Sequence, residues 1–241
     1  MQTASDAALT AERETAAVLQ AYGRGCVEFM GIEILVEPGA LVPRPETELL
    51  GQVALKVLAD MSVDAPRVVD VCCGVGNLAC AIAHHAPTAR VWACDLTDSC
   101  AGIARRNLTQ LKLEQRMSVH QGDLFGALDG LGLEGTIDVV VCNPPYISES
   151  RLRGDRAHLP RLEPIEAFAA GPYGMSCHLR VISAALGFLK PGGTLLMEIG
   201  LGQDRQVAKL FQRSGAYGDV MTVPDGNGNV RAVYASKRHG V

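Results

Sequence analysis

Arg67-Val68-Val69-Asp70-Val71-Cys72-Cys73-Gly74-Val75-Gly76-Asn77 is the stretch that decides the fold of this chain of 241 residues. An apolar run over 67–71 leads into a short loop with two glycines, and a helical pattern follows over 78–85. A buried strand, a glycine loop and a helix in this order are typical of the first unit of a parallel sheet. The stretch therefore predicts an α/β fold with helices on both faces of the sheet.

The same order of strand, loop and helix repeats along the chain. Strands are predicted over 90–94, 117–120, 137–142 and 194–199, helices over 99–111, 179–189 and 203–214, and a turn at Lys190-Pro191-Gly192-Gly193. Residues 221–223 and 231–235 predict a hairpin around Gly226-Asn227-Gly228. Residues 7–22 predict a further helix, so we expect a short helical appendage or lid over 1–30 and one larger domain over 31–241.

The amino-acid composition argues against some classes of binding partner and some locations. The chain is 48% hydrophobic and 20% charged, with a net charge of −4, which is typical of a soluble globular protein and gives no basic signature for nucleic acid. The longest apolar runs fall short of the roughly 20 residues that a membrane span needs. Met1-Gln2-Thr3-Ala4 does not resemble a secretory leader, so a cytoplasmic location is expected.

The cysteines are interpreted as reduced core residues. They show no Cys-x-x-Cys pair and no matching histidine spacing, so no metal site is predicted. Several lie in apolar segments, where a free thiol behaves as a small hydrophobic group. Cys72 and Cys73 differ from the others because they lie inside the glycine loop. The eight are Cys26, Cys72, Cys73, Cys80, Cys94, Cys100, Cys142 and Cys177.

The loop after the first strand favours a nucleoside without phosphates. A dinucleotide site would have three spaced glycines, whereas this loop has only Gly74 and Gly76. S-adenosylmethionine is the common cofactor of that kind. Asp95 could accept from ribose hydroxyls and Asp123 from the adenine amino group, although an Asp at a strand end can also simply cap a helix or form a turn. The predicted cofactor-binding residues here are Asp70, Cys72, Gly74, Gly76, Asn77, Asp95, Leu96, Asp123 and Leu124.

A second decisive motif, Asn143-Pro144-Pro145-Tyr146, ends the strand predicted over 137–142. The prolines fix φ and hold Asn143 in an extended conformation. The Asn143 amide, with the Pro144 carbonyl, could accept hydrogen bonds from an NH₂ group and aim its lone pair, while Tyr146 stacks on a flat ligand. The alternative interpretation is a simple strand end followed by a Pro-Pro turn.

These motifs resemble those of class I S-adenosylmethionine-dependent methyltransferases, and in particular the HemK-type enzymes that methylate glutamine in peptide-chain release factors. The resemblance rests on four stretches: Pro43-Arg44-Pro45-Glu46-Thr47-Glu48, Asn143-Pro144-Pro145-Tyr146, Leu162-Glu163-Pro164 with Gly171 and Gly174, and Asp225 with Gly228 and Arg231. It implies a Rossmann-like, seven-stranded, mostly parallel sheet with a C-terminal antiparallel strand. It also implies catalytic roles for Asn143, Pro144 and Tyr146, and a cofactor site that includes Pro45, Glu46, Thr47 and Asn143.

The chain also departs from that family. About thirty residues precede the shared region, where the family carries a larger helical domain, and the basic stretch 148–160 is either a solvated loop or a substrate contact. Three functions follow: N-methylation of an amide or amine on a small molecule or peptide; cyclisation of S-adenosylmethionine by its own amine to azetidine-2-carboxylic acid with release of methylthioadenosine; or non-catalytic binding of S-adenosylmethionine. A homodimer through the N-terminal helix is a further expectation.

Overall fold

The computed structural model describes residues 4–240, with side chains from residue 8 onward, and its centre is a seven-stranded sheet in the order β5-β4-β3-β6-β7-β9-β8. Strands β3 to β7 are parallel, whereas β9 runs antiparallel to β7 and β8 antiparallel to β9. This sheet confirms the predicted fold class. The strands are β3 Arg67–Val71, β4 Arg90–Asp95, β5 Met117–Gln121, β6 Ile137–Cys142, β7 Leu189–Glu198, β8 Met221–Pro224 and β9 Val230–Ser236.

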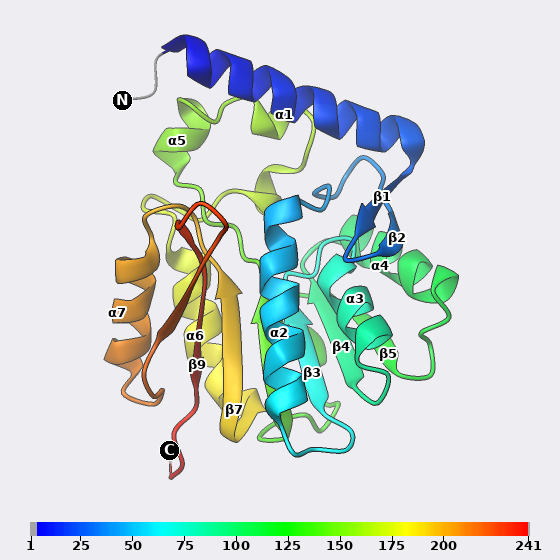
Figure 1. Cartoon of the computed structure of the whole chain (residues 1–241), viewed down its shortest axis with the longest axis vertical. Coiled ribbons are helices and arrows are strands. Elements are labelled where there is room, and N and C mark those ends of the chain that lie inside the picture. The colour runs from blue at the N-terminus through cyan, green and yellow to red at the C-terminus, as the bar shows by residue number, and fades with distance from the viewer. Residues whose placement is uncertain (1–3, 241) are drawn as a thin grey trace.

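Helices cover both faces of this sheet, and a long N-terminal helix lies across one end of the molecule (Figure 1). Side chains of α2, α3 and α4 pack on one face, and those of α6 and α7 pack on the other. The helices are α1 Ala4–Arg24, α2 Glu48–Asp60, α3 Asn77–His85, α4 Asp98–Gln110, α5 Glu149–Arg153, α6 Ser176–Phe188 and α7 Asp204–Ser214. None of the helices within 4–240 is long and apolar enough to cross a membrane.

Several elements were not predicted from the sequence, among them the short helix α5. Two larger ones stand out. One is helix α2, and the other is a hairpin of β1 Cys26–Phe29 and β2 Ile32–Leu35 that pair antiparallel. The hairpin crosses residue 30, where the division into an appendage and a larger domain was expected. Residues 1–3 lie outside the described residues. They belong to that appendage and to the segment that was predicted not to be a secretory leader.

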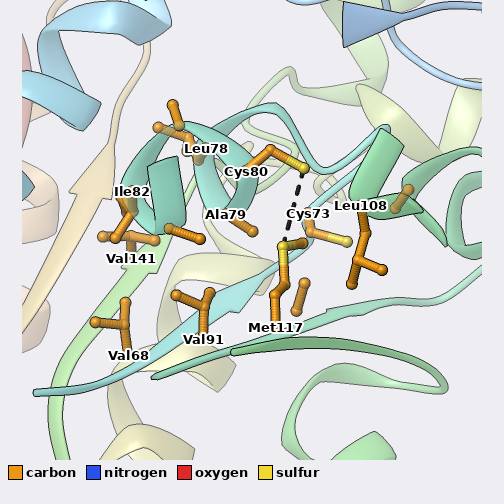
Figure 2. Close-up of a cluster of buried hydrophobic side chains, with 14 of the residues drawn as sticks. Val68, Cys73, Leu78, Ala79, Cys80, Ile82, Val91, Leu108, Met117 and Val141 are labelled. Atoms are coloured by element: carbon orange, nitrogen blue, oxygen red, sulfur yellow. Dashed lines mark hydrogen bonds between the residues drawn. The ribbon is translucent and has the colours of Figure 1, made fainter. Parts of the chain in front are cut away.

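The alternation of side chains along the parallel strands produces the two halves of the core. Val68 and Val91 face α3, as do Val139 and Val141, whereas Val69 and Val140 face α6. Figure 2 shows the first of these layers, in which the Cys80 thiol lies 3.9 Å from the sulfur of Met117. All eight cysteines are unpaired thiols. Cys73, Cys80, Cys94, Cys100 and Cys142 are buried, which confirms their placement in the core, whereas Cys26, Cys72 and Cys177 are only partly buried.

The prediction of a turn at Lys190-Pro191-Gly192-Gly193 is wrong. These residues continue from Leu189 as the irregular beginning of β7, and the register with β6 shifts between Ile137 and Val139. A Cβ atom on Gly193 would lie 2.8 Å from the Ile137 carbonyl oxygen, so the glycine allows β6 to approach closely. The Pro-Gly-Gly composition therefore marks a strand irregularity rather than a turn.

Strand order fixes where a ligand can bind. From β3 the chain builds outward through β4 to β5, and it then returns to place β6 on the opposite side of β3. In open α/β sheets the carboxyl ends of the strands beside such a reversal border the ligand crevice. The glycine loop after β3 and the Asn-Pro-Pro-Tyr motif after β6 both lie at this point.

Candidate active site

The glycine loop is shaped by backbone that only glycine adopts easily. Gly74 and Gly76 have φ of 54° and 80°, and Cys72 has a φ of 59°. A Cβ on Gly76 would lie 3.0 Å from the Cβ of Ala104, so α4 packs directly against this turn. The Gly74 amide donates to Asp95 Oδ2 at 2.9 Å, which ties the loop to the end of β4.

An apolar cavity of about 370 Å³ borders this loop. A Cβ on Gly74 would meet no atom within 4 Å, so the loop backbone is open to a ligand. Asp95 Oδ1 accepts from the Thr97 amide at 3.2 Å and keeps lone pairs for further donors. These residues fit the ribose and base of an adenosine. Seven predicted cofactor-binding residues line the cavity: Cys72, Gly74, Asp95, Leu96, Asp123, Leu124 and Asn143.

Asp123 has a partner that the sequence did not predict. Arg180 from α6 donates to Asp123 Oδ2 at 2.5 Å, and both side chains are slightly more than half exposed. This ion pair raises the pKa of Arg180. An adenine amino group would therefore share the Asp123 carboxylate with Arg180.

The other predicted cofactor residues lie elsewhere. Asp70 is fully buried beneath the loop, accepts the Ala79 amide of α3 at 3.0 Å, and has its pKa raised by burial to about 8. Thr47 and Asn77 line a small cavity of about 30 Å³ with Asn143. Glu46 lines a larger, charged cavity. Pro45 and Gly76 line none of these cavities, and Gly76 is the N-cap of α3.

That charged cavity has a volume of about 490 Å³ and contains all three predicted catalytic residues, Asn143, Pro144 and Tyr146. Asn143 lines the apolar cavity as well, as do Leu41 and Ala167, so the two cavities adjoin at these three residues. The acidic and basic residues around the charged cavity are Glu14, Arg44, Glu46, Arg151, Arg156, Glu198, Asp225 and Arg231.

A buried hydrogen-bond chain holds the Asn143 amide. Its Nδ2 donates to Thr47 Oγ1 at 3.1 Å, and the Thr47 hydroxyl donates to Glu198 Oε2 at 2.7 Å. Within the part of the chain that the structure describes, Asn143 Oδ1 accepts no hydrogen bond. The amide is therefore oriented with its acceptor atom available to an incoming N–H group.

Glu198 connects this chain of hydrogen bonds to Tyr146, whose hydroxyl donates to Glu198 Oε1 at 3.3 Å. Burial raises the pKa of Glu198 to about 7, against the opposing effects of Thr47 and Arg231. Burial also raises the pKa of Tyr146 to about 12, and the neighbouring Glu198 adds to that shift. Glu198 was not predicted to be a site residue. Its position at the carboxyl end of β7, at the same sheet edge as Asp95 and Asn143, was the available signal.

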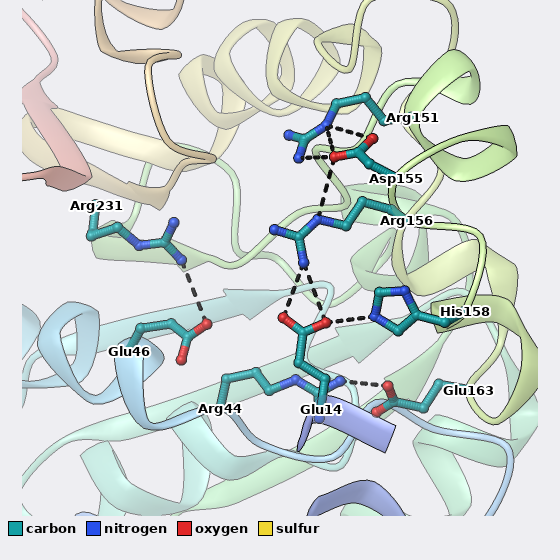
Figure 3. A network of polar contacts seen from close by, with 9 residues as sticks. All are labelled: Glu14, Arg44, Glu46, Arg151, Asp155, Arg156, His158, Glu163 and Arg231. Carbon is teal, nitrogen blue, oxygen red and sulfur yellow. Dashed lines mark hydrogen bonds and ion pairs between the residues drawn. The ribbon is translucent and has the colours of Figure 1, made fainter. Parts of the chain in front are cut away.

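Helix α1 contributes to the outer wall of the charged cavity through Glu14 (Figure 3). Glu14 accepts from Arg156 Nη1 at 3.0 Å, and Glu14 Oε2 lies 2.6 Å from His158 Nε2. Burial raises the pKa of Glu14, but His158 and Arg156 together outweigh it and leave the pKa lowered. The side chains of the stretch 148–160 therefore differ in their contacts. Arg156 and His158 bind Glu14 of α1, whereas Arg151 forms an exposed ion pair with Asp155.

Comparison with known proteins adds to this geometry. The family described as the methyltransferase small domain matches residues 50–158. The release factor glutamine methyltransferase of Moorella thermoacetica is 35% identical over 94% of this chain and 78% of its own length. The 4-amino-L-phenylalanine/4-methylamino-L-phenylalanine methyltransferase of Streptomyces pristinaespiralis is 36% identical over 84% of this chain and 68% of its own. A methyltransferase structure from Pyrococcus furiosus has the same fold, with a TM-score of 0.62 at 17% identity, covering 94% of this chain and 98% of its own.

Proposed function

The chain belongs to the HemK-type release factor glutamine methyltransferase family, and from that premise we propose that it methylates an amide or amine nitrogen held by Asn143 in the charged cavity. S-adenosylmethionine is the methyl donor. The observation that carries the proposal is the position of Asn143, which is the polar member of the three residues that line both the apolar and the charged cavity. We propose that the apolar cavity holds the donor and the charged cavity the acceptor.

The reaction needs alignment more than acid–base chemistry. S-adenosylmethionine supplies a methyl group on a positively charged sulfur, which is already a strong electrophile. Asn143 Oδ1 and the Pro144 carbonyl would accept hydrogen bonds from the acceptor nitrogen and direct its lone pair at that carbon. The new N–C bond forms as the C–S bond breaks with its electron pair on sulfur, which releases S-adenosylhomocysteine, and the methylated nitrogen then loses a proton to water. Tyr146 would form one wall of the acceptor pocket.

Donor contacts are proposed for the residues that line the apolar cavity. Asp95 would accept from the ribose, Leu96 and Leu124 would cover the base, and Gly74 would let the backbone approach closely. Thr47 would act through Asn143, because its hydroxyl lies between Asn143 and Glu198.

The acceptor can be either a small molecule or a peptide. One relative is named for a release factor and another for a free amino acid, and both are similar over most of this chain. The test is to incubate the purified protein with S-adenosylmethionine and, in turn, release factor and free amines and amino acids. We expect a methylated nitrogen and S-adenosylhomocysteine with one class of acceptor. Absence of both products with every acceptor would contradict the proposal.

Asn143→Ala should reduce turnover by at least about 100-fold while it leaves S-adenosylhomocysteine affinity nearly unchanged, because the amide orients the acceptor and not the donor. Gln212→Ala, an exposed amide on α7, is the matched control. Wild-type turnover in Asn143→Ala would remove the role given to Asn143.

A second candidate is that S-adenosylmethionine is the only substrate. The observation in its favour is Glu198, which has its pKa raised by burial to about 7 and lies two hydrogen bonds from Asn143. Such a group could take the proton that an α-ammonium must lose. The amine would then attack the γ-carbon, and the γ-carbon–sulfur bond would break with its electron pair on sulfur. Methylthioadenosine and azetidine-2-carboxylic acid, formed with no acceptor added, would identify this reaction.

A further inference from the structure

Arg231 is an unusual side chain for a buried position. It lies on β9, is 8% exposed, and lines the charged cavity. Its nearest carboxylate oxygens, on Glu198 and Glu46, are 3.6 and 3.7 Å away. A charge-assisted hydrogen bond between a guanidinium and a carboxylate is usually 2.7–2.9 Å long. The guanidinium of Arg231 therefore has donors that neither carboxylate binds at short range.

The other arginines around this cavity are more tightly engaged, as Figure 3 shows. Arg44 donates to the buried Glu163 at short range, Arg156 pairs with Glu14 at 3.0 Å, and Arg151 pairs with Asp155 at 2.8 Å. Of the four arginines that line the cavity, Arg231 is thus the one whose charge is least compensated by a close partner.

The surroundings of Arg231 make it suitable for an incoming anion. Burial raises the pKa of Glu198 to about 7, so near neutral pH this carboxyl is ionised only part of the time. The other neighbour, Glu46, is 45% exposed and shares its charge with solvent. Burial lowers the pKa of Arg231, but Tyr146, Glu198 and Glu46 together outweigh it and leave the pKa raised, although no carboxylate of the described residues lies at hydrogen-bond distance. A buried guanidinium of this kind is a favourable site for an incoming carboxylate.

Arg231 and Asn143 are connected through one carboxyl group. Glu198 Oε1 faces Arg231, while Glu198 Oε2 accepts from Thr47, which accepts in turn from Asn143. An anion on Arg231 and a nitrogen on Asn143 would consequently be close enough to belong to one small molecule. A cavity of about 490 Å³ is within the usual range for small-molecule ligands.

We propose that the acceptor is a free amino acid, or a small molecule with a similar carboxylate, and that Arg231 binds its carboxylate while Asn143 holds the nitrogen. This inference rests on the proposed function, since it identifies the substrate class of the same cavity. Arg231 determines specificity by selecting acceptors that carry a carboxylate within reach of the reacting nitrogen.

The test measures binding separately from turnover. Wild-type protein saturated with S-adenosylhomocysteine is titrated calorimetrically with free L-amino acids and with their α-carboxamides, using glutamine, phenylalanine and lysine as the three pairs. The carboxamide keeps the side chain and removes the carboxylate charge. We expect at least one free amino acid to bind about 10- to 100-fold more tightly than its carboxamide. Equal affinity within every pair, including no binding by either member, would overturn the proposal.

Two variants then assign the preference to Arg231. Arg231→Met should abolish the difference within a pair, and Arg231→Lys should restore part of it because the positive charge remains. Arg213→Met, at an exposed arginine on α7, should leave the difference unchanged. A carboxylate preference that persists in Arg231→Met would overturn the assignment. The proposed function is judged separately, because its test measures the methylated product, whereas the calorimetric test measures binding of the acceptor.

Discussion

Thr47 holds the amide of Asn143 through a hydrogen bond of 3.1 Å from Asn143 Nδ2 to Thr47 Oγ1. The threonine is 2% exposed and donates its own proton to Glu198 Oε2 at 2.7 Å. Because a hydroxyl has a single proton, donation to Glu198 leaves Thr47 as an acceptor toward Asn143. The direction of the whole hydrogen-bond chain is thereby fixed, and among the described residues the Oδ1 atom of Asn143 has no hydrogen-bond donor.

Thr47→Val should lower kcat by about 10- to 100-fold, because the Asn143 amide is then free to rotate and a buried Glu198 oxygen loses its donor. Affinity for S-adenosylhomocysteine, measured by calorimetry, should change little, since Thr47 does not line the apolar cavity. Thr47→Ser should retain most of the activity because it keeps the hydroxyl. Equal kcat values for the valine and serine variants would contradict this role, and Thr222→Val at an exposed position is the control.

Glu198 should make stability depend on pH. Its pKa is raised by burial from the ordinary value of 4.5 to about 7, so its contribution is fully present below about pH 4.5 and is lost as the pH rises through 7. In Glu198→Gln, the fall in unfolding free energy between pH 5 and pH 8 should be smaller by roughly 2 kcal/mol. Part of the fall in unfolding free energy with pH should remain in this variant, because the pKa of Asp70 is also raised and its contribution to stability is likewise lost as the pH rises.

Urea denaturation at four pH values would measure this difference, with Glu12→Gln on the exposed side of α1 as the control. Parallel pH profiles for wild type and Glu198→Gln would show that Glu198 ionises in the folded protein as it does in the unfolded chain.

Glu14→Gln should loosen α1 from the stretch that contains Arg156 and His158. Both ion-pair partners are partly exposed, so the effect should be modest, with the KM for the acceptor raised by a few-fold and donor affinity unchanged. Hydrogen exchange in α1 should also become faster. The matched control on the same helix is Glu12→Gln, and an equal effect in the two variants would deny Glu14 a specific role at the cavity wall.

Gly76→Ala should destabilise the protein by about 1–3 kcal/mol, because φ is 80° and the new Cβ would lie 3.0 Å from Ala104. Gly102→Ala, on α4, is the matched control: its Cβ would meet no atom within 4 Å, and alanine favours a helix interior. Thermal denaturation should show a lower Tm for Gly76→Ala and an unchanged or higher Tm for Gly102→Ala. The opposite order would contradict the tight packing of this loop.

The parallel strands could be predicted because each is a short apolar run between recognisable loops. Strand β6 matches its predicted range of 137–142, and β3 matches 67–71. Helix α2 and the β1–β2 hairpin were not predicted. The turn before Thr194 was predicted wrongly, because proline and glycine occur both in turns and at strand irregularities.

The site could be predicted at the level of loops but not of side-chain direction. Asp95 and Asn143 follow strands whose carboxyl ends meet, so their proximity follows from topology. By contrast, the direction of Thr47 toward Glu198 depends on packing between segments 151 residues apart. The ion pair of Asp123 with Arg180 joins the loop after β5 to α6, and it too depends on packing that the sequence does not reveal.

The two cavities share Leu41, Asn143 and Ala167 but draw most of their other residues from different segments, and this difference bears on how such proteins diversify. The loops at the ends of β3, β4 and β5 make much of the apolar cavity, whereas Glu14 of α1, Arg151 of α5 and Asp225 before the C-terminal strand border the charged cavity. Substitutions in those peripheral segments can reshape one cavity while the loops of the other stay intact. Relatives that share a donor could thus acquire new acceptors during evolution without rebuilding the sheet.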